Sequence, residues 1–128
     1  MHEPSVLVVD DDADLRATLQ DALTEHGFAV STAANGQEAL RYLRASGGAA
    51  SLILLDLMMP VMNGWQFRRE QEQDPALAAI PVLVLSAGNQ LAEAANAIGV
   101  AGFIRKPVDL GQLVSLVALH CRVPVAAS

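Results

Sequence analysis

The sequence predicts a single α/β domain with a doubly wound, five-stranded parallel sheet flanked by five helices. Short apolar runs alternate along the chain with longer segments of helical periodicity, which is typical of a parallel sheet covered on both faces. The 128 residues suit one domain. Hydrophobic residues make up 52% of the chain and charged residues 17%, which is enough apolar side chain for a packed core.

The strands are expected at residues 6–9, 28–33, 52–55, 82–85 and 101–104. The first, third and fourth runs are apolar throughout, as central strands buried on both faces must be. The second contains Ser31 and Thr32, and the fifth is short and built from small residues, so both suit the edges of the sheet. These differences favour the strand order 2-1-3-4-5.

Helices are expected at about residues 15–26, 36–44, 64–73, 90–98 and 110–121, from the apolar spacing and the residues at their ends. Gly27 ends the first helix. Asn35, Asn63 and Asp109 are expected as N-caps, with Glu38 completing a capping box at Asn35.

Composition excludes several classes of partner and site. The net charge of −6 and the pI near 4.8 argue against direct nucleic-acid binding, which needs a basic patch. The single cysteine, Cys121, excludes an internal disulfide and is expected as a buried structural thiol. We find neither a signal peptide nor a membrane-spanning apolar run, so we expect a cytoplasmic protein without membrane insertion.

Polar residues follow four of the five strands. Asp10 and Asp11 follow the first strand, Asp56 the third and Ser86 the fourth, and Lys106 stands two residues after the fifth. The carboxyl ends of parallel strands share one edge, so these side chains should converge there. Clustered carboxylates suit Mg²⁺, or Mn²⁺, and one of them could attack phosphorus to give an aspartyl phosphate. Lys106 and Ser86 would then hold phosphoryl oxygens.

Two further acidic residues have a simpler interpretation. Asp12 and Asp14 stand in the first turn of the helix after the first strand, where the helix dipole favours negative charge.

Four segments, VLVVDDDADLR, LILLDLMMPVMNGW, VLVLSA and GFIRKP, resemble in order the signature segments of bacterial two-component response-regulator receiver domains, of the chemotaxis-regulator-like type. The resemblance runs from Val6 to about Cys121 and implies a flavodoxin-like fold. It implies that Asp56 is the phosphoacceptor. It also implies that Mg²⁺ is bound by Asp11, by Asp56, by the backbone carbonyl of Met58 and, through water, by Asp10.

The resemblance assigns further roles near the carboxyl edge. Ser86 and Phe103 would be switch residues, and Lys106 would be the site lysine, with a cis peptide bond to Pro107. Two departures are mild: Asn63 stands where the family often has aspartate, and Phe103 replaces the tyrosine of some members.

The function implied is a phosphorylation-dependent signalling switch. A histidine kinase or phosphotransfer protein would donate the phosphoryl group, and the chain would catalyse at most its own phosphorylation and dephosphorylation. Output would pass to a protein partner, or to a second copy, through the face formed by residues 82–85, 90–98, 101–104 and 110–121. The receiver domain is expected at residues 1–122, with residues 123–128 as a tail.

Two alternatives stay open on the sequence. A haloacid-dehalogenase-like phosphatase would use Asp10 as its nucleophile within an Asp10-x-Asp12 motif, although Asp14 stands where such enzymes usually have Thr or Val. A receiver-fold binding module would act without phosphorylation.

Overall fold

The computed structural model describes residues 4–57, 59, 61–86 and 100–121. Five parallel strands form one sheet in the order β2-β1-β3-β4-β5, which confirms the predicted fold class and strand order. The strands are β1 (Ser5–Val9), β2 (Ala29–Ala33), β3 (Leu52–Asp56), β4 (Val82–Ser86) and β5 (Gly102–Arg105). Their bounds differ from the expected ones by single residues. At Ser5, Asp56, Ser86 and Arg105 the backbone pairing continues into a polar residue next to the apolar run, whereas β2 and β5 each begin one residue later than expected.

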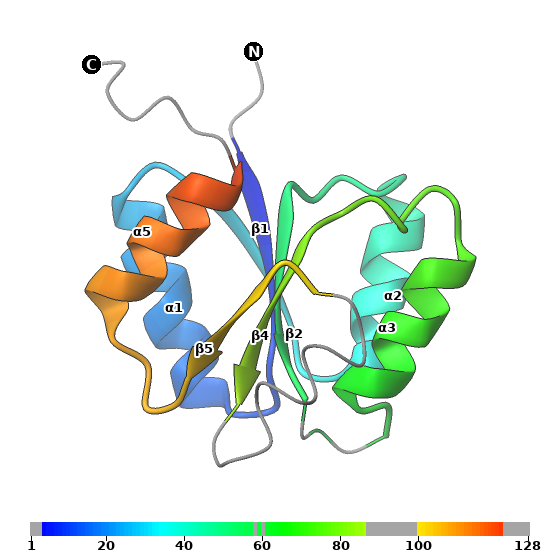
Figure 1. The fold of residues 1–128 in the computed structure, drawn as a ribbon, viewed down its shortest axis with the longest axis horizontal. Helices are drawn as coiled ribbons and strands as arrows, with labels where there is room; N and C mark the ends of the chain where they lie inside the picture. The colour runs from blue at the N-terminus through cyan, green and yellow to red at the C-terminus, as the bar shows by residue number, and fades with distance from the viewer. Residues whose placement is uncertain (1–3, 58, 60, 87–99, 122–128) are drawn as a thin grey trace.

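Of the described helices, two cover each face of the sheet (Figure 1). On one face lie α1 (Ala13–Glu25) and α5 (Leu110–Cys121), and on the other lie α2 (Gly36–Ala45) and α3 (Gly64–Gln73). The helix expected at residues 90–98 lies outside the described residues. None of the described helices combines the length and the apolar character needed to cross a membrane.

The central strands divide the core into two layers by the alternation of their side chains. On β1, Leu7 and Val9 pack in the cluster with α2 and α3, whereas Val6 and Val8 pack in the cluster with α1 and α5. Every residue of β3 and β4 is buried, whereas β2 and β5 are partly exposed. The two strands predicted for the edges are therefore the edge strands.

Asn or Asp caps each described helix. The side chains of Asn35, Asn63 and Asp109 accept hydrogen bonds from backbone N–H groups in the first turns of α2, α3 and α5, as predicted. The box at α2 differs in one detail, because Glu38 accepts from the N–H of Ala34 rather than from that of the cap residue. At Asn63 the complete box is present, with Gln66 as its partner.

Candidate functional site

The strand register places the acidic residues side by side at the carboxyl edge. Val9 of β1 pairs with Leu55 of β3, so Asp10 and Asp56 leave neighbouring strands at the same level. The N–H of Asp10 donates to the carbonyl of Ala33 at 3.1 Å, which ties the start of the β1–α1 loop to the end of β2. The sheet itself therefore sets the separation of the two carboxylates.

Asp10, Asp11 and Asp56 form a carboxylate cluster. Each offers one oxygen atom, and these atoms all lie within 4.8 Å of one another. Asp10 is 0% exposed and Asp56 3% exposed, whereas Asp11 is exposed and opens the cluster to solvent. Three oxygen ligands at this spacing suit a hard divalent cation such as Mg²⁺.

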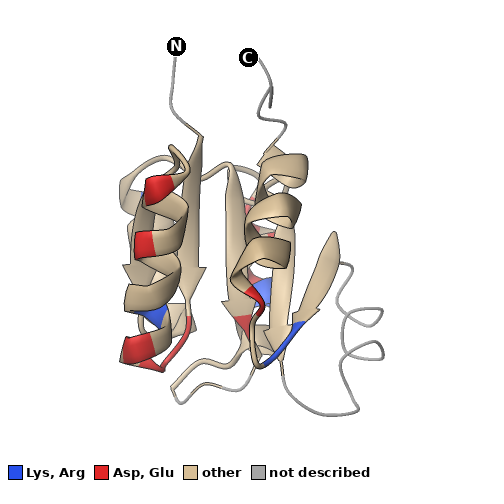
Figure 2. Cartoon of the chain, turned by 90° about the vertical axis from the view of Figure 1, so that its left-hand side faces the viewer, with Lys and Arg blue, Asp and Glu red and all other residues tan. Residues whose placement is uncertain are grey.

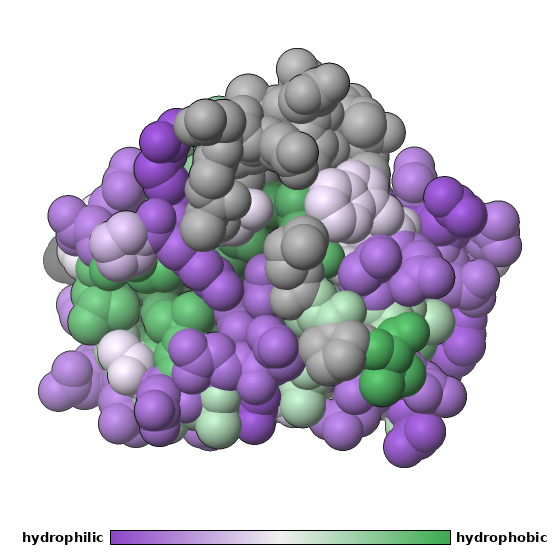
Figure 3. Space-filling view, turned by 90° about the horizontal axis from the view of Figure 1, so that it is seen from below, coloured by the Kyte–Doolittle hydropathy of each residue, from purple (hydrophilic) through white to green (hydrophobic). Residues whose placement is uncertain are grey.

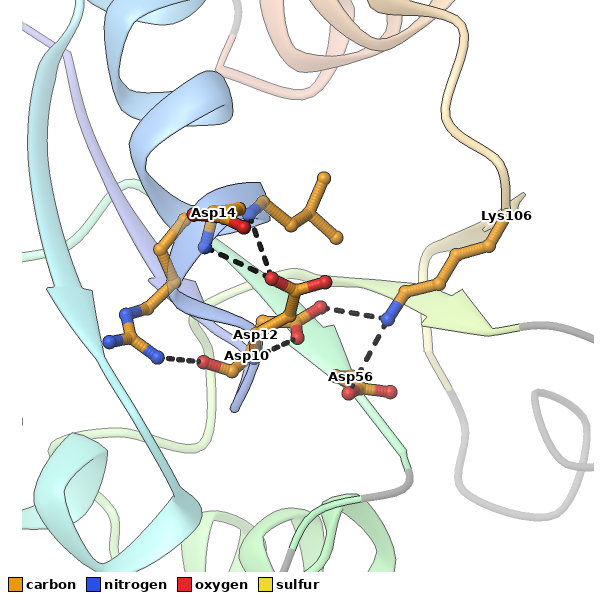
Figure 4. Close-up of polar contacts among 7 residues, drawn as sticks. Asp10, Asp12, Asp14, Asp56 and Lys106 are labelled. Carbon is orange, nitrogen blue, oxygen red and sulfur yellow. Dashed lines mark hydrogen bonds and ion pairs between the residues drawn. The ribbon is translucent and has the colours of Figure 1, made fainter.

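Lys106 supplies positive charge to this cluster (Figure 4). Its Nζ lies 2.9 Å from Oδ2 of Asp10 and 3.5 Å from Oδ2 of Asp56. Partial burial lowers the pKa of the lysine, but the close carboxylate of Asp10, and then the charge of Asp56, outweigh it and raise the pKa above its ordinary value. The ammonium form is thus held between two carboxylates.

The ends of β4 and β5 bring Lys106 into this position. The N–H of Lys106 donates to the carbonyl of Ser86 at 2.9 Å, which joins the last residue of β4 to the chain after β5. The Lys106–Pro107 peptide bond is cis, as the resemblance implied. Ser86 itself is buried, with 6% of its surface exposed.

The two carboxylate oxygens of Asp10 make different contacts. Oδ1 accepts from the N–H of Asp12 at 2.9 Å, which fixes the carboxylate against the β1–α1 loop. Oδ2 is buried and has no hydrogen-bond partner within the described residues, so its contact with Lys106 is an ion pair without good hydrogen-bond alignment. This oxygen retains capacity for a cationic ligand or a metal-bound water.

Glycines close the loop that follows Asp56. The N–H of Gly64 donates to the carbonyl of Leu57 at 3.0 Å, and the N–H of Gly36 to the carbonyl of Met62 at 3.2 Å. A Cβ on Gly64 would lie 2.7 Å from Cα of Leu57 and 2.8 Å from the carbonyl oxygen of Asp56. Only glycine fits there, so the start of α3 packs directly against the backbone at Asp56.

The remaining residues named by the sequence analysis are not among the three carboxylates and the lysine of this cluster. Asp12 caps α1 by accepting from the N–H groups of Asp14 and Leu15, which agrees with the helix-dipole interpretation. Phe103 is 47% exposed on β5 and is not a core residue. Met58 lies outside the described residues. Cys121 is half-buried rather than buried, because it lies in the last turn of α5, where it packs at the margin of the core.

One contact was missed by the sequence analysis. Nη1 of Arg16, in the first turns of α1, donates to the carbonyl of Asp10 at 2.7 Å. The guanidinium holds the loop that carries Asp10 and Asp11. A cation one turn into the helix that follows an acidic run is the signal that could have found it.

Figure 3 shows the molecule from the carboxyl edge. Hydrophilic side chains occupy the middle of this face, with hydrophobic surface to their left, on the side of α1 and α5, and further hydrophobic patches above them and to their right. Asp11 is exposed and the Lys106 side chain is 24% exposed, so the acidic cluster is open to solvent.

A family model described as the response regulator receiver domain matches residues 6–118. The chain belongs to this family. It is a receiver domain of two-component response regulators, as the resemblance predicted.

Solved receiver structures share the fold over nearly their whole length. The chemotaxis protein CheY4 of Vibrio cholerae aligns with a TM-score of 0.84 and 28% identity, over 92% of this chain and 98% of that one. A response regulator receiver protein from Pseudomonas putida aligns with a TM-score of 0.84 and 34% identity, over 93% and 98% of the two chains.

The similar curated proteins are longer. The transcriptional regulatory protein PrrA of Mycobacterium leprae is 39% identical over 119 residues, which cover 89% of this chain and 48% of PrrA. The response regulator Rre1 of a Synechocystis species is 34% identical over 121 residues, or 91% and 52% of the two chains. This receiver domain therefore spans about half the length of these relatives.

Proposed function

We propose that this receiver domain is a phosphorylation-dependent switch in which Asp56 accepts a phosphoryl group from a phosphohistidine of a histidine kinase or phosphotransfer protein. The observation that carries the proposal is the contact of one lysine with two buried carboxylates beside a third, exposed one. Phosphoryl transfer depends mostly on positioning and on neutralising charge, and this cluster supplies both.

The transfer needs little beyond these side chains. A carboxylate oxygen of Asp56 attacks phosphorus, the new O–P bond forms as the P–N bond to the donor histidine breaks, and the ring nitrogen keeps the electron pair. The ammonium of Lys106, 3.5 Å from Oδ2 of Asp56, stabilises negative charge on the phosphoryl oxygens. We assign the hydroxyl of Ser86, at the end of the neighbouring strand, to a second phosphoryl oxygen.

The residues present fit a divalent cation. Three carboxylates and one ammonium leave two net negative charges, and Oδ2 of Asp10 lacks a hydrogen bond within the described residues. We assign Mg²⁺, or Mn²⁺, to Asp11, Asp56 and the backbone carbonyl of Met58, with Asp10 bound through water. When bound, the cation neutralises charge on the transferred group.

Phosphorylation would be read through Ser86 and Phe103. We propose that they rearrange together and alter the surface formed by β4, β5, α5 and residues 90–98, where a downstream protein or a second copy binds. The domain would catalyse at most its own phosphorylation and dephosphorylation, and would not bind nucleic acid directly. We take residues 1–122 as the receiver domain and residues 123–128 as a tail.

The arrangement disfavours the phosphatase alternative. Its Asp10-x-Asp12 motif needs both carboxylates at the reaction centre. Asp12 instead caps α1, and Asp11 joins Asp10 and Asp56 in the cluster.

Intact-mass spectrometry after incubation with Mg²⁺ and acetyl phosphate tests the proposal. We expect one added phosphoryl group in the wild-type chain and none in Asp56→Asn. Uptake that persists in Asp56→Asn and disappears in Asp10→Asn would favour the phosphatase. Absence of uptake by the folded wild-type chain, also from phosphohistidine donors, would favour a binding module that acts without phosphorylation.

A further inference from the structure

Arg16, the only Lys or Arg in α1, directs its side chain back toward the loop before the helix. Its Nη1 donates to the carbonyl of Asp10 at 2.7 Å. Hydrogen bonds from a charged donor at such distances are stronger than those between neutral groups. Among the described residues, no other group donates a hydrogen bond to this carbonyl. The guanidinium therefore holds one backbone group at the edge of the acidic cluster.

The choice of a carbonyl as partner is unexpected for an arginine in this position. Acidic residues run from the end of β1 into the first turn of α1 (Figure 2). Asp12 stands four residues before Arg16, a spacing at which opposite charges on a helix often pair. Asp12 caps the helix instead, and no salt bridge among the described residues includes Arg16 or Asp11. The Asp11 carboxylate thus keeps its full charge for a cation.

The carbonyl that Arg16 binds belongs to the peptide group between Asp10 and Asp11. A peptide group is planar, so fixing its oxygen also fixes the direction in which the chain enters Asp11. Arg16 is itself anchored, because its N–H donates to the carbonyl of Asp12 at 3.0 Å within the first turn of α1. The helix therefore sets the orientation of the Asp10–Asp11 peptide through this side chain.

The carboxylate of Asp10 has supports of its own. Its Oδ1 accepts from the N–H of Asp12, and its Oδ2 lies 2.9 Å from Nζ of Lys106. The N–H of the same residue donates to the carbonyl of Ala33. Asp11 is exposed and depends on the orientation of the preceding peptide. Loss of the Arg16 contact therefore acts mainly on Asp11.

We propose that Arg16 is a positioning residue for the divalent-cation site. By fixing the Asp10–Asp11 peptide, the guanidinium keeps the carboxylate of Asp11 close to those of Asp10 and Asp56, where the three offer oxygens within 4.8 Å of one another. This inference rests on the cation site of the proposed function. Removing a group that orients metal ligands typically weakens metal binding about 10–100-fold. We expect the lower end, because one of three carboxylates is affected.

The sign of the effect separates positioning from charge. A positive charge near a cation site repels the cation, so removal of an arginine that acted by charge alone would tighten metal binding. Removal of an arginine that positions Asp11 weakens it, because a ligand then has to be ordered when the cation binds.

The test titrates the unphosphorylated full chain with Mn²⁺ and measures the free ion by electron paramagnetic resonance. Arg16→Met should raise the dissociation constant about tenfold. Arg16→Lys keeps the charge and a donor group, and should raise it by about threefold or less. Arg41→Met removes the same charge from an exposed position of α2 and should stay within about twofold of wild type. Circular dichroism checks that each variant is folded.

Phosphoryl uptake from acetyl phosphate at graded Mg²⁺ concentrations gives a second measurement. Arg16→Met should need about tenfold more Mg²⁺ for its half-maximal rate. At saturating Mg²⁺ its rate should stay within about twofold of wild type, because the contact between Lys106 and Asp56 does not involve the Asp10 carbonyl.

Three results would overturn the inference: unchanged or tighter Mn²⁺ binding by folded Arg16→Met, equal effects of Arg16→Met and Arg41→Met, or a lower saturating rate with an unchanged Mg²⁺ requirement. Absence of Mn²⁺ binding by the wild-type chain would overturn the cation assignment and this inference with it. Mn²⁺ binding that depends on Arg16 in a chain that takes up no phosphoryl group would support the inference and contradict the proposed phosphoryl transfer alone.

Discussion

Replacing Lys106 with Met tests how far one ammonium holds the acidic cluster together. Methionine keeps an unbranched apolar side chain and removes the charge, so Asp10 and Asp56 are left buried without their cation. Their side chains are 0% and 5% exposed, so water cannot substitute freely for the ammonium. We expect a large loss of stability, because an uncompensated buried charge is costly.

The two ion-pair distances of Lys106 determine how large a loss in the free energy of unfolding we expect. At an effective dielectric constant of about 20, charges at the observed distances of 2.9 Å and 3.5 Å attract by roughly 5 kcal/mol each before desolvation is counted. Breaking buried pairs costs about 3–5 kcal/mol net. Because the lysine side chain is 24% exposed, we expect the lower end, about 3 kcal/mol.

Urea unfolding at neutral pH measures this loss as a lower midpoint, by about 1–3 M, with an unchanged slope. Arg41→Met removes one positive charge from an exposed position of α2 and should change the free energy of unfolding by less than about 0.5 kcal/mol. A loss below about 1 kcal/mol for Lys106→Met, or a loss equal to that of Arg41→Met, would refute the reasoning.

The stability difference between wild type and Lys106→Met should also depend on pH. Because folding raises the pKa of Lys106, its pairing stabilises the wild-type chain at all pH values below the lysine's ordinary pKa. That contribution is lost only as the pH rises through the raised value. Saturating Mg²⁺ should narrow the difference in stability between wild type and Lys106→Met, since the cation replaces the missing charge.

Three further predictions concern a glycine, a helix cap and the cysteine. Gly64→Ala should destabilise the chain by about 1–3 kcal/mol in urea unfolding and slow phosphoryl uptake, because its Cβ would displace the backbone at Asp56; unchanged uptake would contradict this. Asn63→Ala should cost about 1 kcal/mol by removing the capping box of α3, and a stability equal to wild type would count against that role. Burial raises the pKa of the Cys121 thiol to about 11 from 9.0, so stability gained from this group is present below pH 9 and lost toward pH 11. Iodoacetamide at pH 9 should alkylate Cys121 at least about tenfold more slowly in the folded chain than in urea, and equal rates would exclude the burial effect.

The strand order could be predicted from the sequence because the burial of a strand determines which residue types it contains. Strands covered on both faces must be apolar throughout, and the runs at residues 52–55 and 82–85 are. Ser31 and Thr32 in β2 indicated an edge strand, because a strand buried on both faces would not contain them. Strand ends were harder to place, since Asp56 and Ser86 continue the backbone pairing although their side chains are polar.

The candidate site was predictable where topology alone brings residues together. Parallel strands place Asp10 and Asp56 at one edge whatever the details of packing, and Lys106 follows the edge strand β5, which β4 separates from β3. Contacts made by backbone groups could not be predicted in this way, because they produce no recognisable pattern in the sequence. Two examples are the hydrogen bond from Arg16 to the carbonyl of Asp10 and the close packing of Gly64 on Leu57. Both depend on loop geometry that no local sequence pattern specifies.

The central claim is that the phosphoryl group resides on Asp56. Borohydride reduces an acyl phosphate and leaves a free carboxylate unchanged, so peptide mapping after phosphorylation and reduction identifies the modified aspartate as homoserine. The account predicts homoserine at position 56, dependent on Mg²⁺ and absent from unphosphorylated chain. Homoserine at position 10 or 11, with position 56 unmodified, would contradict it.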